Sequence, residues 1–380
     1  MAIMNCALAQ GSWTQKANLG SIAKARTFGF SIGTKGYVGT GTDGNQDSAD
    51  FWEYDPQTDV WTQKANMGSN ARIGAVGFSL GNKGYAGLGI SSVYQIPKSD
   101  FWEYNPQNNT WTQKASYPGT GKICAVGFSI GDFGYIGTGS IIGTIGNESK
   151  EFWQYNPATD SWIKKADFPG NKRDRAAGFS IALKGYIGTG YQGISPSALG
   201  DFWEYNPATD SWVQKATVPE LSRVNGVGFS TGSKGYIGMG YGKTDFWQYS
   251  PDNDSWLQMA AFPGASRIFA SGFAIGNKGY FGTGNFASSY YNDFWEYSEQ
   301  LLGVEHNFHH RFDVYPNPTS DFINLSPNDA VIETSLYDIQ GREKLKTTYS
   351  RIDISNLPVG IYYLKIKTAD GVFLKKIIKN

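Results

Sequence analysis

The sequence is poor in the residues that build metal and disulfide sites. Of its 380 residues, two are cysteine and three are histidine, so we expect no zinc or iron–sulfur site, no other metal and no disulfide framework. Lys plus Arg number 33, as do Asp plus Glu. The resulting zero net charge argues against a nucleic-acid partner, because duplex binders carry a basic excess. No run of about 18 apolar residues occurs, so we expect no membrane span.

Glycine and aromatic residues are abundant instead. The chain has 48 glycines, its aromatic content is 15%, and its charged content is 17%. Disordered chains are poor in aromatics and rich in charge, and a coiled coil would be rich in Ala, Glu, Lys and Leu. The composition therefore indicates a soluble protein of β-structure.

The N-terminus carries an export-like pattern. Ala7-Leu8-Ala9 has the small-x-small spacing of a signal-peptidase site. We interpret residues 1–9 as the remnant of a signal peptide, and an ordinary frayed N-terminus remains the alternative.

The last seventy residues differ from the rest in composition and in hydrophobic pattern. Tryptophan is absent after Trp295, and short β-branched runs alternate with Pro, Asn and Gly turn signals. We expect a linker over residues 300–310 and a small Ig-like β-sandwich of about seven strands over residues 311–380.

Four motifs in this segment carry a family resemblance. They are Val314-Tyr-Pro-Asn-Pro-Thr319, Tyr337-Asp-Ile-Gln-Gly341, Leu357-Pro-Val-Gly-Ile-Tyr-Tyr-Leu364 and Lys375-Lys-Ile-Ile-Lys379. In order, spacing and position, the segment resembles the type A C-terminal domain of the type IX secretion system of Bacteroidota. The resemblance implies that the secretion machinery is a partner, and that the protein is secreted or attached to the outer-membrane surface.

The middle of the chain repeats one unit six times, with a period of 44 to 51 residues. Two series of Trp account for all 12 tryptophans, and a Gly-Tyr pair precedes each Phe-Trp pair. The Phe-Trp series is Trp52, Trp102, Trp153, Trp203, Trp247 and Trp295. The second series is Trp13, Trp61, Trp111, Trp162, Trp212 and Trp256.

Each unit contains four short alternating segments, which predict four strands. In one unit they are Ala75–Leu80, Tyr85–Gly89, Phe101–Asn105 and Trp111–Lys114. The unit resembles the kelch repeat at its Gly-Tyr pair and at a Tyr and a Trp seven residues apart, although it has Gly-x-Gly where kelch has two adjacent glycines. The resemblance implies an all-β fold, a six-bladed, four-stranded β-propeller over residues 10–299.

The two ends of the repeat array complement each other. The segment Trp13–Ala17 has no strands before it, and the last unit has no Trp segment after Tyr297. We expect the N-terminal strand to complete the last blade and so to remove a free sheet edge.

One face of the propeller is expected to vary between blades. The loops between the second and third strands and the connectors between blades emerge there, and binding residues often lie on such loops. These loops carry Tyr94, Tyr191, Tyr241, Phe286, Tyr290 and Tyr291. Exposed rings at these positions would suit stacking on sugars, and packing within the loops is the alternative.

A basic residue lies six positions before each inner-strand Phe. We expect these residues to ring the mouth of the channel: Lys24, Arg72, Lys122, Arg173, Arg223 and Arg267. An acid precedes every Phe-Trp pair: Asp50, Asp100, Glu151, Asp201, Asp245 and Asp293. The bases could form an anion site for a carboxylate or a sulfate. The alternative is that each base pairs structurally with an acid.

Catalysis is weakly indicated. The histidines His306, His309 and His310 all follow the propeller, so a histidine-ligated copper site or a Ser-His-Asp centre cannot be built within it. We assign no catalytic residue and no cofactor. Some bacterial kelch proteins isomerise sialic acid with Arg and Glu, so a metal-free carbohydrate enzyme of that kind remains the alternative. The residues that depart from the repeat are Asp174, Arg175, Glu220, Asn225, Lys98 and Glu148.

These patterns predict a secreted or cell-surface module that binds a glycan or a protein on its variable face. The repeat is most disturbed in blades four and five. We therefore predict that ligand contacts come from Arg173, Arg175, Arg223, Tyr191 and Tyr241.

Overall fold

The chain divides into two compact units, Met1–Gln300 and Leu301–Asn380. A computed structural model describes residues 11–68, 71–93, 95–141, 146–193, 197–220, 223–299, 313–326, 331–338, 342–368 and 372–380. Their regular elements are all β-strands, and among them no helix is long and apolar enough to cross a membrane.

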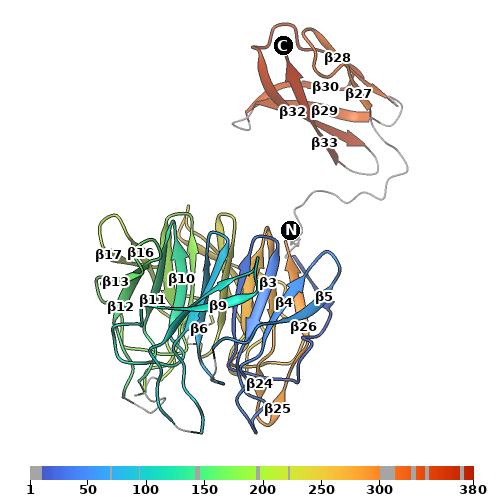
Figure 1. The fold of residues 1–380 in the computed structure, drawn as a ribbon. Helices are drawn as coiled ribbons and strands as arrows, with labels where there is room; N and C mark the ends of the chain where they lie inside the picture. Colours follow the sequence, from blue (N-terminus) through green and yellow to red (C-terminus); the bar gives the residue numbers. More distant parts are fainter. Residues whose placement is uncertain are drawn as a thin grey trace, which may run out of the picture. The chain divides into compact units, whose positions relative to one another are not determined.

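The first unit is a ring of six four-stranded antiparallel sheets, the blades (Figure 1). The innermost strands are β2 (Phe28–Ile32), β6 (Val76–Leu80), β10 (Val126–Ile130), β14 (Ala177–Ile181), β18 (Val227–Thr231) and β22 (Ser271–Ile275). The second strands are β3 (Lys35–Gly39), β7 (Lys83–Gly87), β11 (Phe133–Gly137), β15 (Lys184–Gly188), β19 (Lys234–Gly238) and β23 (Lys278–Gly282). The third strands are β4 (Phe51–Asp55), β8 (Phe101–Asn105), β12 (Phe152–Asn156), β16 (Phe202–Asn206), β20 (Phe246–Ser250) and β26 (Phe294–Ser298). The outermost strands are β5 (Val60–Lys64), β9 (Thr110–Lys114), β13 (Ser161–Lys164), β17 (Ser211–Lys215), β21 (Ser255–Met259) and β1 (Ser12–Lys16). The last blade also carries a short hairpin, β24 (Asn285–Phe286) and β25 (Ser289–Tyr290).

The N-terminal strand closes the ring, as predicted. Strand β1 pairs antiparallel with β26, from Ser12 opposite Ser298 to Lys16 opposite Phe294. The Trp13 indole nitrogen donates to the carbonyl oxygen of Ala260 in the preceding blade, at 2.9 Å. Trp61 makes the same contact with the carbonyl of Ala17, at 3.0 Å. The last blade is therefore joined to its neighbour in the same way as a blade made from one continuous segment.

The glycine of each Gly-Tyr pair makes room for an inner-strand ring of the neighbouring blade. A Cβ atom on Gly84 would lie only 2.4 Å from Cζ of Phe30. Equivalent clashes occur at Gly36, Gly134, Gly185, Gly235 and Gly279. The blades thus interlock through a buried aromatic core, in which Tyr85 of the second blade and Tyr155 of the third lie with ring centroids 5.6 Å apart.

The second strands begin and end two residues earlier than predicted. The hairpin loop after β6 consists of Gly81 and Asn82 alone, because Leu80 already pairs with Lys83. Gly81 has a positive φ of 55°, which suits a two-residue turn. At the other end Leu88 has a φ of 59°, so the chain leaves the strand at Gly87. The Gly-x-Gly pattern therefore marks a left-handed turn at the end of each second strand.

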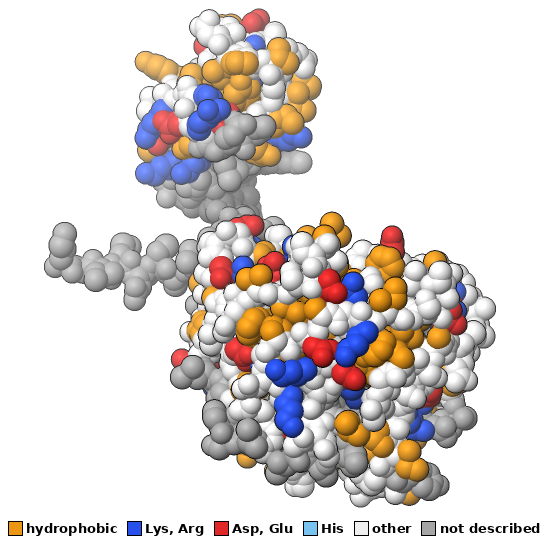
Figure 2. Space-filling view, turned by 90° about the vertical axis from the view of Figure 1, so that its left-hand side faces the viewer, with side chains coloured by type: hydrophobic (Ala, Val, Ile, Leu, Met, Phe, Trp, Pro, Cys, Tyr) orange, Lys and Arg blue, Asp and Glu red, His pale blue; other side chains and the backbone are white. Residues whose placement is uncertain are grey.

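The outer strands of the propeller carry mixed side chains. Ile163 on β13 and Val213 on β17 are 55% and 56% exposed. Figure 2 shows this side, where basic and acidic side chains are interspersed between hydrophobic ones. The surface drawn there has no extended field of one sign.

The second unit consists of two sheets. One contains β27 (Asp313–Tyr315), β28 (Phe322–Ser326) and β31 (Arg351–Asp353), and the other contains β30 (Glu343–Thr347), β29 (Val331–Asp338), β32 (Gly360–Thr368) and β33 (Val372–Lys379). Both sheets contribute to one buried core, which includes Ile323, Ile352, Leu336 and Leu364. The seven strands agree with the predicted sandwich.

Candidate functional site

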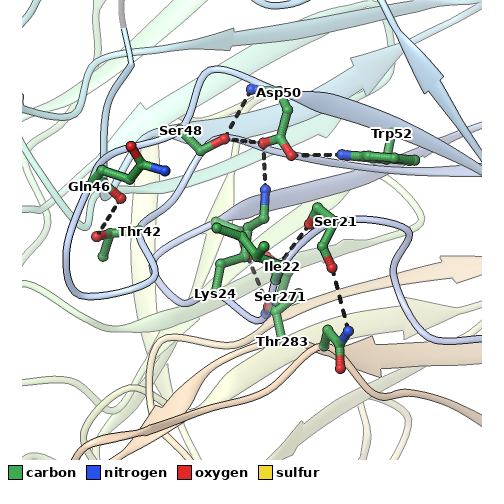
Figure 3. Close-up of polar contacts among 12 residues, drawn as sticks. Ser21, Ile22, Lys24, Thr42, Gln46, Ser48, Asp50, Trp52, Ser271 and Thr283 are labelled. Carbon is green, nitrogen blue, oxygen red and sulfur yellow. Dashed lines mark hydrogen bonds and ion pairs between the residues drawn. The ribbon is translucent and has the colours of Figure 1, made fainter.

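The six predicted basic residues are buried on the connectors that precede the innermost strands, and each meets the acid at the start of the third strand of the same blade. The Arg173 guanidinium forms a two-pronged contact with Asp201, with both N–O distances 2.7 Å, and also donates to the carbonyl of Thr189 at 2.8 Å. In Figure 3 the Lys24 ammonium meets Asp50, whose other carboxylate oxygen accepts from the Trp52 indole at 2.7 Å. The other pairs are Arg72–Asp100, Lys122–Glu151, Arg223–Asp245 and Arg267–Asp293.

These pairs are tight despite their burial. Burial raises the pKa of Asp201, but the hydrogen bonds and charge of Arg173 outweigh it and hold that pKa below the ordinary value. In the first blade, burial lowers the pKa of Lys24 against the opposing pull of Asp50. Each base thus ties the connector between blades to the start of a third strand. Arg173 and Arg223, which are 0% and 2% exposed, do not present a free cation to the channel mouth.

The side chains at the mouth are those two positions after each base. They are Arg26, Gly74, Cys124, Arg175, Asn225 and Phe269, and all six line one axial cavity of about 130 Å³. All six have positive φ, from 52° to 63°. They differ from blade to blade, whereas the buried bases beside them repeat, so the pseudosymmetry of the propeller breaks at this ring.

A belt of backbone hydrogen bonds holds the mouth together. The amide of Gly74 donates to the carbonyl of Arg26 at 3.0 Å, and the amide of Cys124 donates to that of Gly74 at 3.0 Å. In the same way, the amide of Arg175 donates to the carbonyl of Cys124 at 3.1 Å and the amide of Asn225 donates to the carbonyl of Arg175 at 3.2 Å. The amide of Arg26 donates to the carbonyl of Phe269 at 2.9 Å. Each bond joins neighbouring blades, so the mouth is pre-formed.

Two guanidinium groups at the mouth lack a tight carboxylate partner. Arg26 lies over the Phe269 ring, 4.4 Å from its centroid, and forms no ion pair with any carboxylate in the described ranges. Arg175 lies 5.1 Å from the centroid of Tyr191 and 5.7 Å from that of Phe269. Its Nε is 3.8 Å from Oδ2 of Asp174 and has no hydrogen-bond partner among the described residues. Because Nε of Arg175 is buried, any contact of this side chain with a ligand would come from its terminal Nη groups, and the same edge of the guanidinium is the one that Arg26 can offer.

Two buried acids lie behind Arg175. Asp174 is 2% exposed, and its Oδ1 has no hydrogen-bond partner among the described residues. Burial raises the pKa of Asp174 to about 6, with Arg175 opposing the shift and Glu148 adding to it. Oε1 of Glu148 accepts from the Gly193 amide at 3.0 Å. The structure thus brings together three residues that depart from the repeat: Asp174, Arg175 and Glu148.

The aromatic residues predicted on the variable face differ in exposure and in packing. Tyr241 is 69% exposed, whereas Tyr191 is half-buried and lies against Arg175. Tyr291 lies under the buried Arg267, 4.2 Å from its guanidinium carbon. Tyr290 fills the space above Gly44, where a Cβ would lie 2.8 Å from the ring. Loop packing therefore accounts for Tyr290 and Tyr291, and Tyr94 lies outside the described residues.

Other candidates lie away from the axial cavity. Lys98 and Glu220 are not among its lining residues. The described residues hold no group of three or more His, Cys, Asp or Glu side chains that could bind a metal. His306, His309 and His310 lie outside the described ranges.

Sequence reasoning singled out Arg175 and Asn225 but missed Arg26, Cys124 and Phe269. The signal was present, because aligning the six units on their basic residues shows a position that holds Arg, Gly, Cys, Arg, Asn and Phe in turn. The basic residues two positions earlier repeat in every unit, so they dominate the sequence pattern and were predicted as ligand residues instead.

Comparisons with known proteins support the two-part organisation. Residues 313–380 match the family model described as "Secretion system C-terminal sorting domain", and residues 41–68 match the "Kelch motif". A solved structure titled "Structure of YjhT", a kelch-type propeller, is similar with a TM-score of 0.64 at 15% identity, covering 73% of this chain and 95% of that one. At that identity the likeness concerns the fold alone.

A curated relative is similar over a short segment. It is "Beta-agarase D" of Zobellia galactanivorans, 37% identical over 70 residues, which are 18% of this chain and 14% of the relative. The chain thus spans a small part of that protein. Together, the motif, the fold and the sorting domain identify the chain as a six-bladed kelch-type propeller followed by a type IX C-terminal sorting domain, which directs it to the cell surface or the extracellular space.

Proposed function

We propose that the propeller is an extracellular binding module whose axial mouth takes an anionic group of its ligand. The observation that carries this proposal is the pair Arg26 and Arg175. Both face one cavity and neither forms a hydrogen-bonded ion pair with a carboxylate of the described residues, while the six bases beside them are all neutralised. A cation left without a close partner at a pre-formed concave site favours a carboxylate or a sulfate.

The remaining mouth residues suit the same group. The Asn225 amide can donate further hydrogen bonds, and the Phe269 ring lies against both arginines. Phe269 covers one face of each guanidinium and leaves the planar edge for bidentate contacts. Tyr191 supports Arg175 from the other side.

We propose a glycan as the ligand, with Arg175, Tyr191 and Tyr241 retained from the sequence-based prediction and Arg26, Asn225 and Phe269 added. Arg173 and Arg223 act indirectly, because their ion pairs fix the connectors that carry Arg175 and Asn225. A protein that presents an acidic side chain would use the same mouth, and it is an outcome of the test.

The test measures the affinity of the full chain for carboxylated and sulfated oligosaccharides, with methyl-esterified or desulfated counterparts as neutral controls. Losing one charge-assisted hydrogen bond, worth about 1.5–3 kcal/mol, should weaken binding of the acidic sugars at least tenfold in Arg26→Ala and in Arg175→Ala. Lys164→Ala, a half-exposed base on an outer strand, should change nothing. Equal affinity in wild type and both arginine variants, or equal affinity for acidic and neutral sugars, would refute the proposal.

One observation favours a second candidate, a metal-free enzyme acting on an acidic sugar such as sialic acid. Asp174 is a buried carboxyl with a pKa of about 6 next to Arg175, and such a group can exchange a proton near neutral pH. The full chain should then accelerate the interconversion of the anomers of sialic acid in an NMR exchange experiment, and Asp174→Asn should abolish that acceleration. A rate equal to that of buffer alone would exclude this candidate.

A further inference from the structure

Two exposed aromatic side chains lie just outside the mouth. Tyr241 is 69% exposed and Phe286 is 38% exposed, and their ring centroids are 6.0 Å apart with an interplanar angle of 44°. We infer that they form a second subsite for a sugar ring, so that the ligand is an acidic oligosaccharide or polysaccharide rather than an isolated anion. This inference rests on the proposed function of the mouth.

The size of the mouth requires a second contact surface for any sugar. Its cavity of about 130 Å³ is well below the 300–1,000 Å³ of a typical ligand pocket. A carboxylate or sulfate group fits there, but a chain of pyranose rings must lie on the face outside.

On one side of the mouth, the aromatic pair is connected through backbone contacts to residues adjacent to the mouth. The Tyr241 amide donates to the carbonyl of Val224 at 3.2 Å, and Val224 directly precedes the mouth residue Asn225. Phe286 follows Asn285, which bridges to Ile268, the residue before the mouth residue Phe269. The pair therefore borders the mouth between blades five and six.

The loop between the second and third strands is shortest in blade five. It spans 239–245 there, whereas the corresponding segments of the other blades span 40–50, 88–100, 138–151, 189–201 and 283–293. The short loop leaves the Tyr241 ring uncovered. A ligand chain that starts in the mouth would leave the propeller over this shortest loop.

The Phe286 ring is held in place by a feature of the last blade. It lies on the β24–β25 hairpin, the only two-stranded sheet among the described residues, which projects at the lower edge of the ring in Figure 1. Tyr290 of the same hairpin packs against Gly44 of the first blade. The hairpin is thus anchored on one side, and it presents Phe286 to Tyr241 on the other.

The chemistry of the pair suits a sugar ring. Aromatic rings offer large, rigid contact area at a low cost in conformational entropy, and the C–H face of a pyranose is apolar. The pair carries no charge, so it contributes area and orientation, and the arginines select the acidic group. The expected ligand therefore has an acidic substituent on one residue and a neighbouring ring that stacks on Tyr241 and Phe286.

The experiment compares chain lengths. Galacturonate and its oligomers up to the tetramer, and a parallel series of sulfated galactose oligomers, are titrated into the full-length protein and its variants. In at least one series, the affinity of wild type should rise tenfold or more between the monomer and the trimer. The double variant Tyr241→Ala/Phe286→Ala should lose the rise, so that it binds the trimer no more tightly than it binds the monomer. Val93→Ala/Ile96→Ala, which truncates exposed side chains of the second blade's loop, should keep it.

Separate outcomes refute the subsite and the anion site. A wild-type affinity independent of chain length, or a rise that persists in Tyr241→Ala/Phe286→Ala, overturns the subsite while leaving the anion site intact. A rise preserved in Tyr241→Phe/Phe286→Tyr and lost in the double alanine variant supports stacking of the ring faces. Failure of wild type to bind any member of either series overturns the anion site and the subsite together.

Discussion

Two aspartates of the fourth blade should respond to the same substitution with opposite signs. Asp174 is buried behind Arg175, one of its oxygens has no hydrogen-bond partner within the described part of the chain, and its pKa is raised from 3.8 to about 6. Asp201 is held by two hydrogen bonds from Arg173, and its pKa is lowered. We expect Asp174→Asn to stabilise the propeller at neutral pH and Asp201→Asn to destabilise it.

The magnitudes follow from linkage between protonation and folding. A carboxyl whose pKa rises by about two units on folding is costly to ionise, at about 1.4 kcal/mol per unit, so Asp174 costs on the order of 3 kcal/mol at pH 7.5. The free-energy cost of ionising Asp174 applies in full above the folded-state pKa near 6, and it disappears as pH falls towards the unfolded-state pKa of 3.8. Asp201 behaves in reverse: its contribution is present above about pH 4 and is lost below it. Removing the charge of Asp201 leaves Arg173 buried beside a neutral amide, a loss of about 3 kcal/mol.

Tryptophan fluorescence is the appropriate readout, because all 12 tryptophans lie between Trp13 and Trp295 and the sorting domain has none. Thermal melts of the full chain at pH 7.5 and at pH 5 therefore follow the propeller alone. Asp174→Asn should melt above wild type at pH 7.5, and its advantage should shrink at pH 5. Asp201→Asn should melt below wild type at both values.

A melting temperature of Asp174→Asn at or below that of wild type at pH 7.5, or the same gain in melting temperature at both pH values, would refute the ionisation cost assigned to Asp174. The first result would mean that the Asp174 carboxylate is stabilised by contacts with Ser140, Arg175 or solvent more strongly than burial disfavours it. Asp201→Asn serves as the matched control, since it removes the same charge from the same blade.

Two further predictions concern the ends of the propeller and the tail. Trp13→Ala should lower the free energy of unfolding by about 3 kcal/mol, because the half-buried indole contacts Phe246, Phe262 and Tyr297 and donates to the carbonyl of Ala260. An unchanged melting temperature would mean that β1 does not hold the propeller closed. Gln15→Ala, on the exposed side of β1, is the control. A chain ending at Glu299 should keep the wild-type fluorescence spectrum and melt but accumulate in the periplasm of its own host, as measured by fractionation; normal yield outside the cell would show that residues 311–380 are not the export signal.

The repeated parts of the fold could be predicted because each appears six times. The spacing of Gly-Tyr, Phe-Trp and the second Trp indicated four strands per unit, and the orphan segment at Trp13 indicated the closure, which the β1–β26 pairing confirms. The third strand, Phe101–Asn105, was predicted at its observed bounds. The second strand was misplaced by two residues, because alternation alone does not reveal that Leu80 and Lys83 already pair across a two-residue turn.

The candidate site was harder to predict because it depends on where side chains point. The bases two residues before the mouth look like ligand residues in the sequence, yet they turn inward onto acids such as Asp100, which lies 28 residues from Arg72 in the chain. Arg26 and Phe269 are brought together by ring closure, since they belong to the first and last blades. A contact between residues so far apart in the chain follows from the geometry of the ring and from no local pattern.

The backbone belt around the mouth separates stability from specificity. Its bonds use amide and carbonyl groups alone, so replacing the side chain at a mouth position with that of any residue other than proline removes none of them. The left-handed conformation costs a residue other than glycine about 1–2 kcal/mol, and Arg26, Cys124, Arg175, Asn225 and Phe269 already adopt it. A library that randomises these positions would therefore sample new ligand preferences on one unchanged frame, and duplication of blades followed by drift at this ring would give natural selection the same opportunity.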